Sequence, residues 1–279
     1  MKKINRRSFL AAAGLTAAAL ALTACGGSAS STASSTASSA ASSEAASTSA
    51  AAELTTVEAG KLTMATNAAF PPYEMTTDAG EFEGIDIDTA KAIAEKLGLE
   101  LQIDDMDFDA ALLSVQQGKA DIVMAGVTVT DERKAVMDFS DSYATGIQSI
   151  IVPEGSDITS PDDLAGKKIG TQRGTTGYIY CSDDFGDDAV VAYDDGLTAV
   201  QALNNGQVDA VVIDNAPAKE FVAANPGLVI LDTSYAEEDY AIGMAKGNTA
   251  LEDAVNAALE ELKADGTLQS IVDKYITAE

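Results

Sequence analysis

The sequence predicts an α/β protein built from largely parallel β-sheets and organised as two similar halves. From residue 61 onward, short apolar runs alternate with helical patterns, which is the arrangement of an α/β domain. One strand–helix unit occurs twice along the chain. The composition of the 279 residues, 46% hydrophobic and 22% charged, is that of an ordinary globular protein with a buried core.

The first half is expected to begin with a strand and to alternate from there. Strands are predicted at residues 62–66, 99–104 and 121–125, and helices at residues 86–97 and 109–117. Asp88 stands where a helix N-cap is expected, and Gly98 stands where the helix should stop.

The second half follows the same plan after residue 146. Strands are predicted at residues 168–171, 190–193, 209–213 and 228–231, and helices at residues 197–205 and 216–224. The seven residues 117–123 (QGKADIV) match residues 205–211 (NGQVDAV), and their Gly and Asp are explained by a helix end and a strand start. In this register Gly126 falls on Asp214, just beyond each strand. Because ligands of open α/β sheets bind beyond the carboxyl ends of the strands, two such edges are expected to form a cleft.

Charge and composition exclude several functions. The four basic residues before Cys25 leave 13 Lys and Arg against 44 Asp and Glu in the rest of the chain, a net charge of −31. Such a surface repels phosphates, so no nucleic acid partner is expected. The absence of His excludes catalysis by a Ser-His-Asp or Cys-His site and a zinc site built from His.

The N-terminus has the pattern of an export signal. Residues 1–24 combine a basic start with an apolar run, and the sequence Leu-Thr-Ala before Cys25 resembles a bacterial lipoprotein signal. The resemblance implies that Cys25 carries lipid, including palmitate, and holds the protein at the extracellular face of the cell membrane. A short transmembrane anchor is the alternative. Residues 25–53 are rich in Ser and Ala and are expected to be a disordered tether. No intramolecular disulfide is then possible, and Cys181 is expected at the surface or half-buried.

A series of segments resembles, in order, the polar amino-acid family of solute-binding proteins of ABC importers, the family 3 type. The segments are residues 67–74 (NAAFPPYE), 84–88 (GIDID), 106–109 (MDFD), 125–133 (AGVTVTDER), 139–141 (FSD), 174–177 (GTTG), 208–214 (VDAVVID) and 263–268 (KADGTL). The resemblance spans about residues 60–276. It implies a two-lobe, periplasmic-binding-protein-like (type II) fold with two chain crossovers, near residues 143–148 and 240–244. Lobe 1 is expected to hold residues 54–145 and 242–279, and lobe 2 residues 146–241.

The α-carboxylate of an amino acid requires a planar cation and fixed N–H donors. Thr130 can cap a helix whose first turn holds Arg133, and a cation there opposes the helix dipole unless an anion compensates it. The resemblance places Arg133 and the Thr128 hydroxyl on the ligand carboxylate. A surface ion pair of Arg133 with Asp131 or Asp141 is the alternative.

The α-ammonium requires a buried carboxylate. Asp214 ends an apolar strand and could be only a helix N-cap, but the resemblance gives it the ammonium, shared with the Ala125 carbonyl and Gly126. The Gly-Thr-Thr segment ending at Thr176 precedes a predicted helix whose free N–H groups favour an anion. It resembles the second carboxylate contact of the family, centred on Thr176. A phosphate-binding loop is rejected because no Lys follows the glycine.

The ligand side chain is expected between the two aromatic walls Phe70 and Phe108, which the resemblance implies, and beside Asn67 and Gln172. Relatives that take basic amino acids tend to carry an acid where this chain has Asn67. A neutral polar amino acid or cystine is therefore favoured, and an acidic ligand steered by Arg173 is left open.

These residues lead to one functional prediction. The protein captures a free amino acid by closure of the two lobes and delivers it to an ABC permease with its ATPase, as a monomer with no cofactor and no metal. The alternatives are an exported enzyme resembling cyclic keto-acid dehydratases and a ligand-sensing subunit. The enzyme is disfavoured because no His is present and no Glu is expected at a cleft position.

Overall fold

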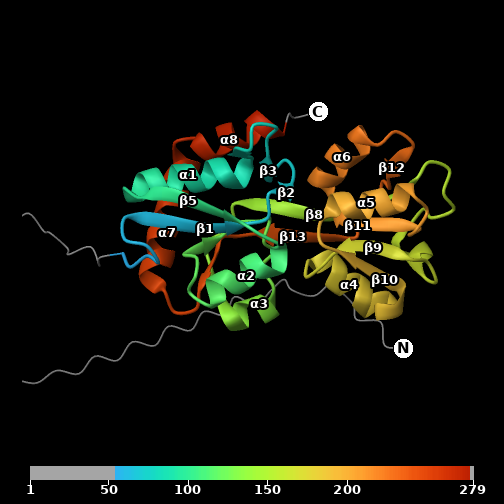
Figure 1. The fold of residues 1–279 in the computed structure, drawn as a ribbon, viewed down its shortest axis with the longest axis horizontal. Coiled ribbons are helices and arrows are strands. Elements are labelled where there is room, and N and C mark those ends of the chain that lie inside the picture. The colour runs from blue at the N-terminus through green and yellow to red at the C-terminus, as the bar shows by residue number, and fades with distance from the viewer. Residues whose placement is uncertain (1–53, 277–279) are drawn as a thin grey trace, which may run out of the picture. The chain divides into compact units, whose positions relative to one another are not determined.

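The computed structural model describes residues 54–276. The expected signal peptide 1–24, the lipidation site Cys25 and the tether 25–53 lie outside the described residues. Within residues 54–276, no helix has the length and apolar character needed to cross a membrane. Figure 1 shows two groups of helices and strands joined by a narrow waist of strands, and each group is built around one central sheet.

The first lobe contains a five-stranded sheet. Its order is β5 (Glu100–Asp105), β1 (Lys61–Thr66), β6 (Ile122–Val123), β14 (Gly243–Ala245) and β7 (Met137–Phe139). The strand β1 is parallel to β5 and β6, whereas β14 is antiparallel to its neighbours. Helices α1 (Ile85–Leu97), α7 (Thr249–Ala264) and α8 (Thr267–Tyr275) pack together. In Figure 1 the short helices α2 (Phe108–Gln116) and α3 (Asp131–Val136) lie on the side of the sheet opposite α1.

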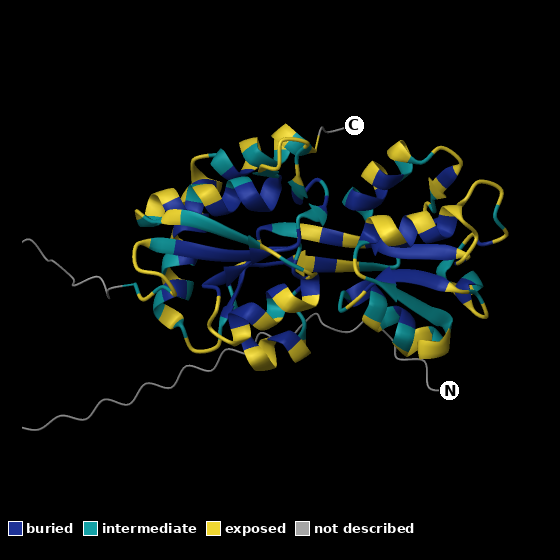
Figure 2. Cartoon of the chain, viewed as in Figure 1, coloured by how far each residue is buried: buried dark blue, intermediate teal, exposed yellow. Residues whose placement is uncertain are grey.

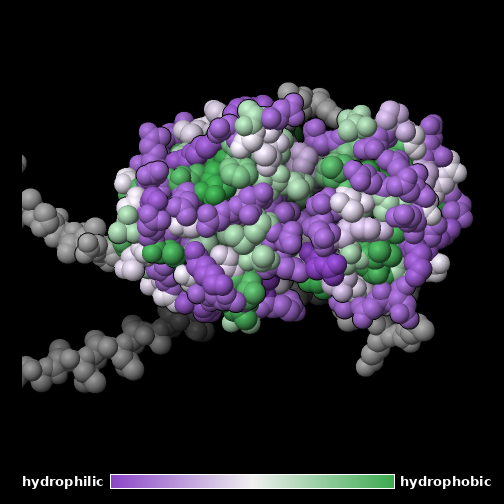
Figure 3. All heavy atoms as spheres, in the orientation of Figure 1, coloured by the Kyte–Doolittle hydropathy of each residue, from purple (hydrophilic) through white to green (hydrophobic). Residues whose placement is uncertain are grey.

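The second lobe contains a six-stranded sheet. Its order is β10 (Val190–Tyr193), β9 (Ile169–Gln172), β11 (Ala210–Asp214), β8 (Ala144–Pro153) and β12 (Leu228–Ile230), and β13 (Ala236–Tyr240) also pairs with β8. The helices are α4 (Thr176–Phe185), α5 (Gly196–Asn204) and α6 (Asn215–Ala224), with single 3-10 turns at Pro161–Leu164 and Asp187–Ala189. Figure 2 shows the inner strands of both central sheets largely buried, the edge strands β5 and β10 mostly half-buried, and the outer helix faces exposed. Figure 3 shows hydrophilic residues over most of the viewed face, with apolar residues in small groups.

The chain crosses between the lobes twice. It passes from β7 in the first sheet to β8 in the second, and returns from β13 to β14. The strands β8 and β13 pair antiparallel, with Glu238 opposite Gly146. The segment after β6 joins them, because Thr128 forms a bridge with Tyr240 and Val129 N–H donates to the Asp239 carbonyl. A small sheet of β2 (Ala69–Phe70), β3 (Glu74–Thr76) and β4 (Phe82–Glu83) follows β1.

The predicted strands and helices of both halves agree with the structure to within two residues at each end. Gly98 ends α1 in the left-handed conformation, as expected (φ 68°). The N-cap prediction for Asp88 is wrong, because α1 begins three residues earlier and Gly84 is its N-cap. The Asp88 carboxylate instead accepts hydrogen bonds from Lys274 Nζ (2.7 Å) and the Tyr275 hydroxyl (2.8 Å), which fasten α8 to α1.

The expectation that Cys181 is exposed or half-buried is also wrong. Cys181 is fully buried in the apolar core of the second lobe, which also contains Leu164 and Ile169. It lies on the inner face of α4, and a small apolar side chain fits that position.

The repeated unit keeps its structural role in both lobes. Asp121 accepts hydrogen bonds from the N–H groups of Val57 and Thr63, and Asp209 accepts one from Lys168 N–H. Each aspartate therefore fixes the start of a neighbouring strand.

Candidate functional site

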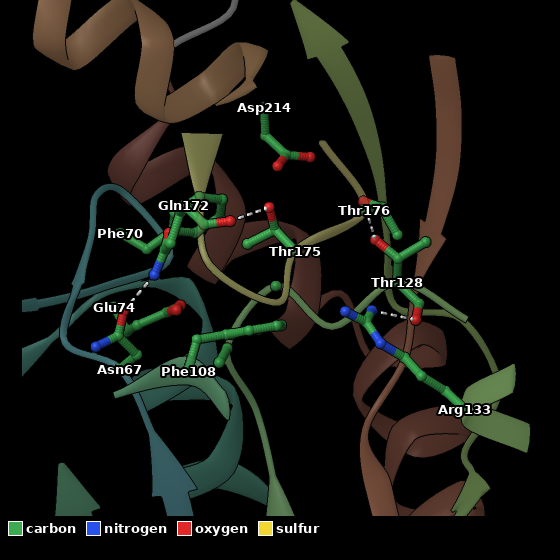
Figure 4. Close-up of a pocket in the computed structure, with 12 residues that line it drawn as sticks. Asn67, Phe70, Glu74, Phe108, Thr128, Arg133, Gln172, Thr175, Thr176 and Asp214 are labelled. Carbon is green, nitrogen blue, oxygen red and sulfur yellow. Dashed lines mark hydrogen bonds between the residues drawn. The ribbon is translucent and has the colours of Figure 1, made fainter. Parts of the chain in front are cut away.

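One cavity gathers all ten residues that the sequence analysis proposes for ligand binding, and Figure 4 shows their arrangement. Its volume in this structure is about 10 Å³, close to the least that one water molecule needs. Its lining consists of Asn67, Phe70, Glu74, Phe108, Ala125, Gly126, Thr128, Arg133, Gln172, Thr175, Thr176 and Asp214. The residues up to Arg133 come from the first lobe, and the other four come from the second. Sequence reasoning missed Glu74 and Thr175.

Arg133 supplies the positive charge of the cavity. The Thr130 hydroxyl caps α3 by accepting a hydrogen bond from Arg133 N–H, as expected. The guanidinium donates to the Thr128 carbonyl (2.8 Å) and to the Gly174 carbonyl of the other lobe (3.1 Å), and it lies 5.4 Å from the centre of the Phe108 ring. The side chain is buried, at 8% exposure, and this burial lowers its pKa from the usual value. Arg133 therefore points into the cavity and is not a surface residue.

Asp214 supplies a carboxylate from the second lobe. It occupies the N-cap position of α6, but its side chain makes no capping hydrogen bond. One oxygen accepts from Gln148 Nε2 (2.8 Å), and the other accepts from the Tyr240 hydroxyl. Burial raises the pKa of Asp214 to about 7, although the hydrogen bonds from Tyr240 and Gln148 oppose the rise. A positive ligand group would stabilise the charged form that burial disfavours.

The two threonine hydroxyls meet across the lobes. Thr128 Oγ1 and Thr176 Oγ1 are 3.5 Å apart, and both donate to the carboxylate of Glu238 on β13, at 3.2 and 2.9 Å. Thr176 opens α4, and Thr175 is its N-cap. The first N–H groups of a helix have no partner within the helix, so the start of α4 offers donors to an anion.

Gly126 lets the backbone approach the cavity closely. Its backbone is left-handed (φ 54°), and an added Cβ would lie 2.8 Å from Phe70 Cε1. Its N–H donates to Asp86 Oδ2 (3.0 Å), which holds the turn after β6 in place. The Ala125 carbonyl and Gly126 are therefore presented by a backbone conformation that favours glycine.

The far end of the cavity is formed by amides and aromatic rings. Gln172 Nε2 donates to Asn67 Oδ1 across the lobes (2.9 Å), and Asn67 Nδ2 donates to the Met106 carbonyl (2.9 Å). Phe70 and Phe108 line the cavity, and both are almost fully buried. Arg173 does not line it. This side chain is exposed, and its Nε lies 3.7 Å from Asp194 Oδ1.

Glu74 is the cavity residue that corrects the sequence analysis most directly, because no Glu was expected at a cleft position. It is fully buried, and neither of its carboxylate oxygens accepts a hydrogen bond from a donor group of the described residues, although its carboxyl group lies against that of Asp86. Burial, and then the charge of Asp86, raise its pKa well above the usual value. Burial also raises the pKa of Asp86 to about 6, against the hydrogen bonds from Gly126 N–H and the Tyr143 hydroxyl. Glu74 therefore offers the cavity either a neutral carboxyl group or a receptor for a cation.

Part of this set was within reach of the sequence. Glu74 directly follows Phe-Pro-Pro-Tyr, so a charged residue next to a segment already assigned to the cavity was a usable signal. Glu238 alternates with Glu237 and Asp239 in an acidic run, and only the pairing of β13 with β8 reveals that it points inward.

The arrangement matches a small molecule that carries both charges. A buried guanidinium and a helix start favour a carboxylate, whereas Asp214 favours a cation. The Phe70 and Phe108 rings and the amides of Asn67 and Gln172 line the rest of the cavity.

Comparison with known proteins identifies a family with the same architecture. The profile of "Bacterial extracellular solute-binding proteins, family 3" matches residues 62–278. A probable histidine-binding protein of Neisseria gonorrhoeae is 32% identical over 99% of this chain and 98% of its own length. The L-cystine-binding protein TcyJ of Escherichia coli K12 is 33% identical over 80% of this chain and 85% of its own. A solved structure of an ancestral arginine-binding protein bound to glutamine is 43% identical, with a TM-score of 0.75, and covers 78% of this chain and 99% of that protein.

Proposed function

Because this chain belongs to the bacterial extracellular solute-binding proteins of family 3, we propose that its cavity holds the zwitterionic end of one polar amino acid. It is an amino-acid solute-binding protein of an ABC transporter and not an enzyme. The observation that carries the proposal is the opposition of Arg133 and Asp214 within one buried cavity.

In the proposed complex the ligand carboxylate binds Arg133 and the N–H groups at the start of α4. Two parallel N–H···O bonds from a guanidinium suit a carboxylate, and Arg133 has five N–H donors, of which two reach backbone carbonyls. The ligand ammonium binds Asp214 and the Ala125 carbonyl. Contacts from both lobes favour the closed arrangement, because the ligand interacts with both only when they are close.

For the ligand side chain we propose a neutral polar group or cystine. Asn67 and Gln172, already joined to each other, supply amide groups at that end of the cavity. Burial raises the pKa of Glu74 well above its usual value, which favours the neutral carboxyl group. A neutral carboxyl group both donates and accepts a hydrogen bond, which suits an amide. The cystine-binding relative is consistent with this class.

A cationic amino acid is the second candidate, and one observation favours it. The Glu74 carboxyl group lies against that of Asp86 and accepts no hydrogen bond from a donor group of the described residues, and a guanidinium is a bidentate partner for a carboxylate. The probable histidine-binding relative and the ancestral arginine-binding protein are named for amino acids of this class.

Proton release separates the two classes. Binding of L-arginine would ionise Glu74, so calorimetric titrations in two buffers with different ionisation enthalpies should show protons leaving the protein. Asp214, whose pKa is raised to about 7, releases protons with any amino acid, so Glu74→Gln should lower the proton release with L-arginine only to the level seen with L-glutamine. It should also weaken L-arginine, while leaving L-glutamine within about threefold. The neutral class would be established if L-glutamine or L-cystine binds tightly, L-arginine does not, and Glu74→Gln leaves the number of protons released on binding unchanged. No binding of any of the three would contradict both side-chain classes.

We further propose that the closed protein docks on an ABC permease while lipid on Cys25 holds it at the extracellular face of the membrane as a monomer. The support is the sequence pattern before Cys25 and the Ser- and Ala-rich stretch after it. Mass spectrometry of the membrane-extracted protein tests the anchor. A diacylglyceryl thioether at Cys25, lost in Cys25→Ser, is expected, whereas an unmodified Cys25 in the membrane fraction would contradict it.

A further inference from the structure

Glu238 is a buried acid in the strand that returns the chain to the first lobe. On β13 it stands between Glu237 and Asp239, which are exposed, whereas Glu238 is only 7% exposed. Successive side chains of a strand point to opposite faces, so Glu238 faces inward where β13 pairs with β8. A charge in that position requires partners.

Its partners are polar groups of the cavity and of the layer behind it. Glu238 Oε2 accepts hydrogen bonds from Thr128 Oγ1 (3.2 Å), Thr176 Oγ1 (2.9 Å) and Gln148 Nε2 (3.0 Å). Thr128 and Thr176 line the cavity from opposite lobes, and Gln148 Nε2 also donates to Asp214. The second oxygen of Glu238, Oε1, has no partner among the described residues. One carboxylate oxygen therefore connects the crossover strand, both lobes and the Asp214 side chain.

The number of protons decides what these hydroxyls can offer a ligand. A threonine hydroxyl has one proton and two lone pairs. When Thr128 and Thr176 both donate to Glu238, neither hydroxyl has a proton left for the cavity. Thr128 presents lone pairs, and Thr176, which also accepts from Gln148 Nε2 (3.4 Å), presents its remaining lone pair. Lone pairs accept from an ammonium group and repel a carboxylate. With the Asp214 carboxylate adjacent, this part of the cavity is built for a cation.

We propose that Glu238 is a positioning residue that fixes the direction in which the amino acid lies, by holding the protons of the Thr128 and Thr176 hydroxyls away from the ligand. This inference rests on the proposed function and refines it. The hydroxyls accept from the ligand ammonium, and the ligand carboxylate depends on Arg133 and on backbone N–H groups. The contact that the sequence analysis expects between the Thr128 hydroxyl and the carboxylate is thereby reassigned.

Glu238→Gln in the full chain is the direct test. The amide has nearly the shape of the carboxylate, and its oxygen can take the position of Oε2, where the three donors meet. It has no negative charge, so it holds the two hydroxyl protons more weakly and leaves them able to turn toward the cavity. Two matched probe pairs are titrated: L-glutamine with glutaramic acid, and L-arginine with 5-guanidinovaleric acid. In each pair the second compound lacks only the α-ammonium group.

The preference for the amino acid over its partner compound is the readout. We expect Glu238→Gln to reduce this preference roughly tenfold or more, because a charge-assisted arrangement around the ammonium is lost. Glu237→Gln, an exposed neighbour on the same strand, should leave the preference unchanged. A role of Glu238 in stability alone would weaken both members of a pair equally, and that result would overturn the proposal.

A second pair of variants keeps the test decisive if Glu238→Gln does not fold. Thr128→Ser retains the hydroxyl and should retain the preference, whereas Thr128→Val removes it and should reduce the preference. Equal preferences in the two variants would overturn the proposal. If the wild-type chain binds the amino acids of neither pair nor any other amino acid, the proposed function itself fails, a result distinct from wild-type binding with a preference that Glu238→Gln does not alter.

Discussion

Replacing Arg133 with alanine should remove most of the affinity for an amino acid. Arg133 is 8% exposed, so a ligand carboxylate bound to its guanidinium would be withdrawn from water. Each hydrogen bond between charged groups contributes about 1.5–3 kcal/mol, and an unpaired buried charge costs about 3–5 kcal/mol. This range corresponds to an increase in Kd by roughly two to three and a half orders of magnitude.

The assay is isothermal titration of the ligand-free wild-type and variant proteins. Arg133→Lys keeps the charge but loses the planar fork, so its affinity should lie between the two. Lys134→Ala alters the next residue, which is exposed, and should bind normally. Because Arg133 also donates to the Thr128 and Gly174 carbonyls, urea unfolding without ligand must show that the variant is folded. A folded Arg133→Ala protein with Kd within about threefold of wild type would refute the assignment of the carboxylate.

Three further predictions concern the residues around the ligand. Gly126→Ala should lower the free energy of unfolding by about 1–3 kcal/mol, and by more than Gly98→Ala. Both positions have positive φ, but only a Cβ at residue 126 would lie within 2.8 Å of Phe70. Equal losses in urea titrations would show that the contact is unimportant. The affinity for the amino acid should rise with pH up to about 7 and then level off, because burial raises the pKa of Asp214 to about 7 and an ammonium binds the ionised form. Asp214→Asn should abolish this pH dependence. A flat wild-type profile between pH 5 and 8, measured by calorimetry, would contradict the prediction. The Asp86 pKa is raised from 3.8 to about 6, so the stability that its protonated form contributes, about 3 kcal/mol at most, is fully present below pH 3.8 and is lost as the pH rises through 6. The difference in free energy of unfolding between wild type and Asp86→Asn should therefore shrink between pH 4.5 and 7.5. A constant difference would count against a buried charge.

The fold was predictable because local patterns specify most of it. Alternating apolar strands and amphipathic helices, and the repeated Gly and Asp at residues 118–121 and 206–209, identify the parallel parts of both lobes. Most of the ten predicted cavity residues lie together because they end or follow strands or lie in the first turn of a helix, where both lobes present groups to the cleft. Their contacts with a ligand remain predictions.

The residues that sequence reasoning missed depend on non-local pairing. Glu238 faces inward only because β13 pairs with β8 in one register, and a shift by one residue would expose it. Glu74 is buried by the small sheet that follows β1, whose strands are too short to give a periodic signal. Asp88 was misplaced because α1 starts at Ile85, and its polar residue Asp86 is buried by contacts with Gly126 and Tyr143, distant in sequence.

The central claim is that the cavity recognises both the α-ammonium and the α-carboxylate group of a free amino acid. The most direct measurement is titration of the full chain, unfolded and refolded to remove bound ligand, with the twenty amino acids and cystine, followed by the N-acetyl and the carboxamide derivatives of whichever ligand binds. The account predicts submicromolar binding of one or a few polar amino acids, and loss of binding when either end is blocked. Undiminished binding of the N-acetyl or the carboxamide derivative would contradict it.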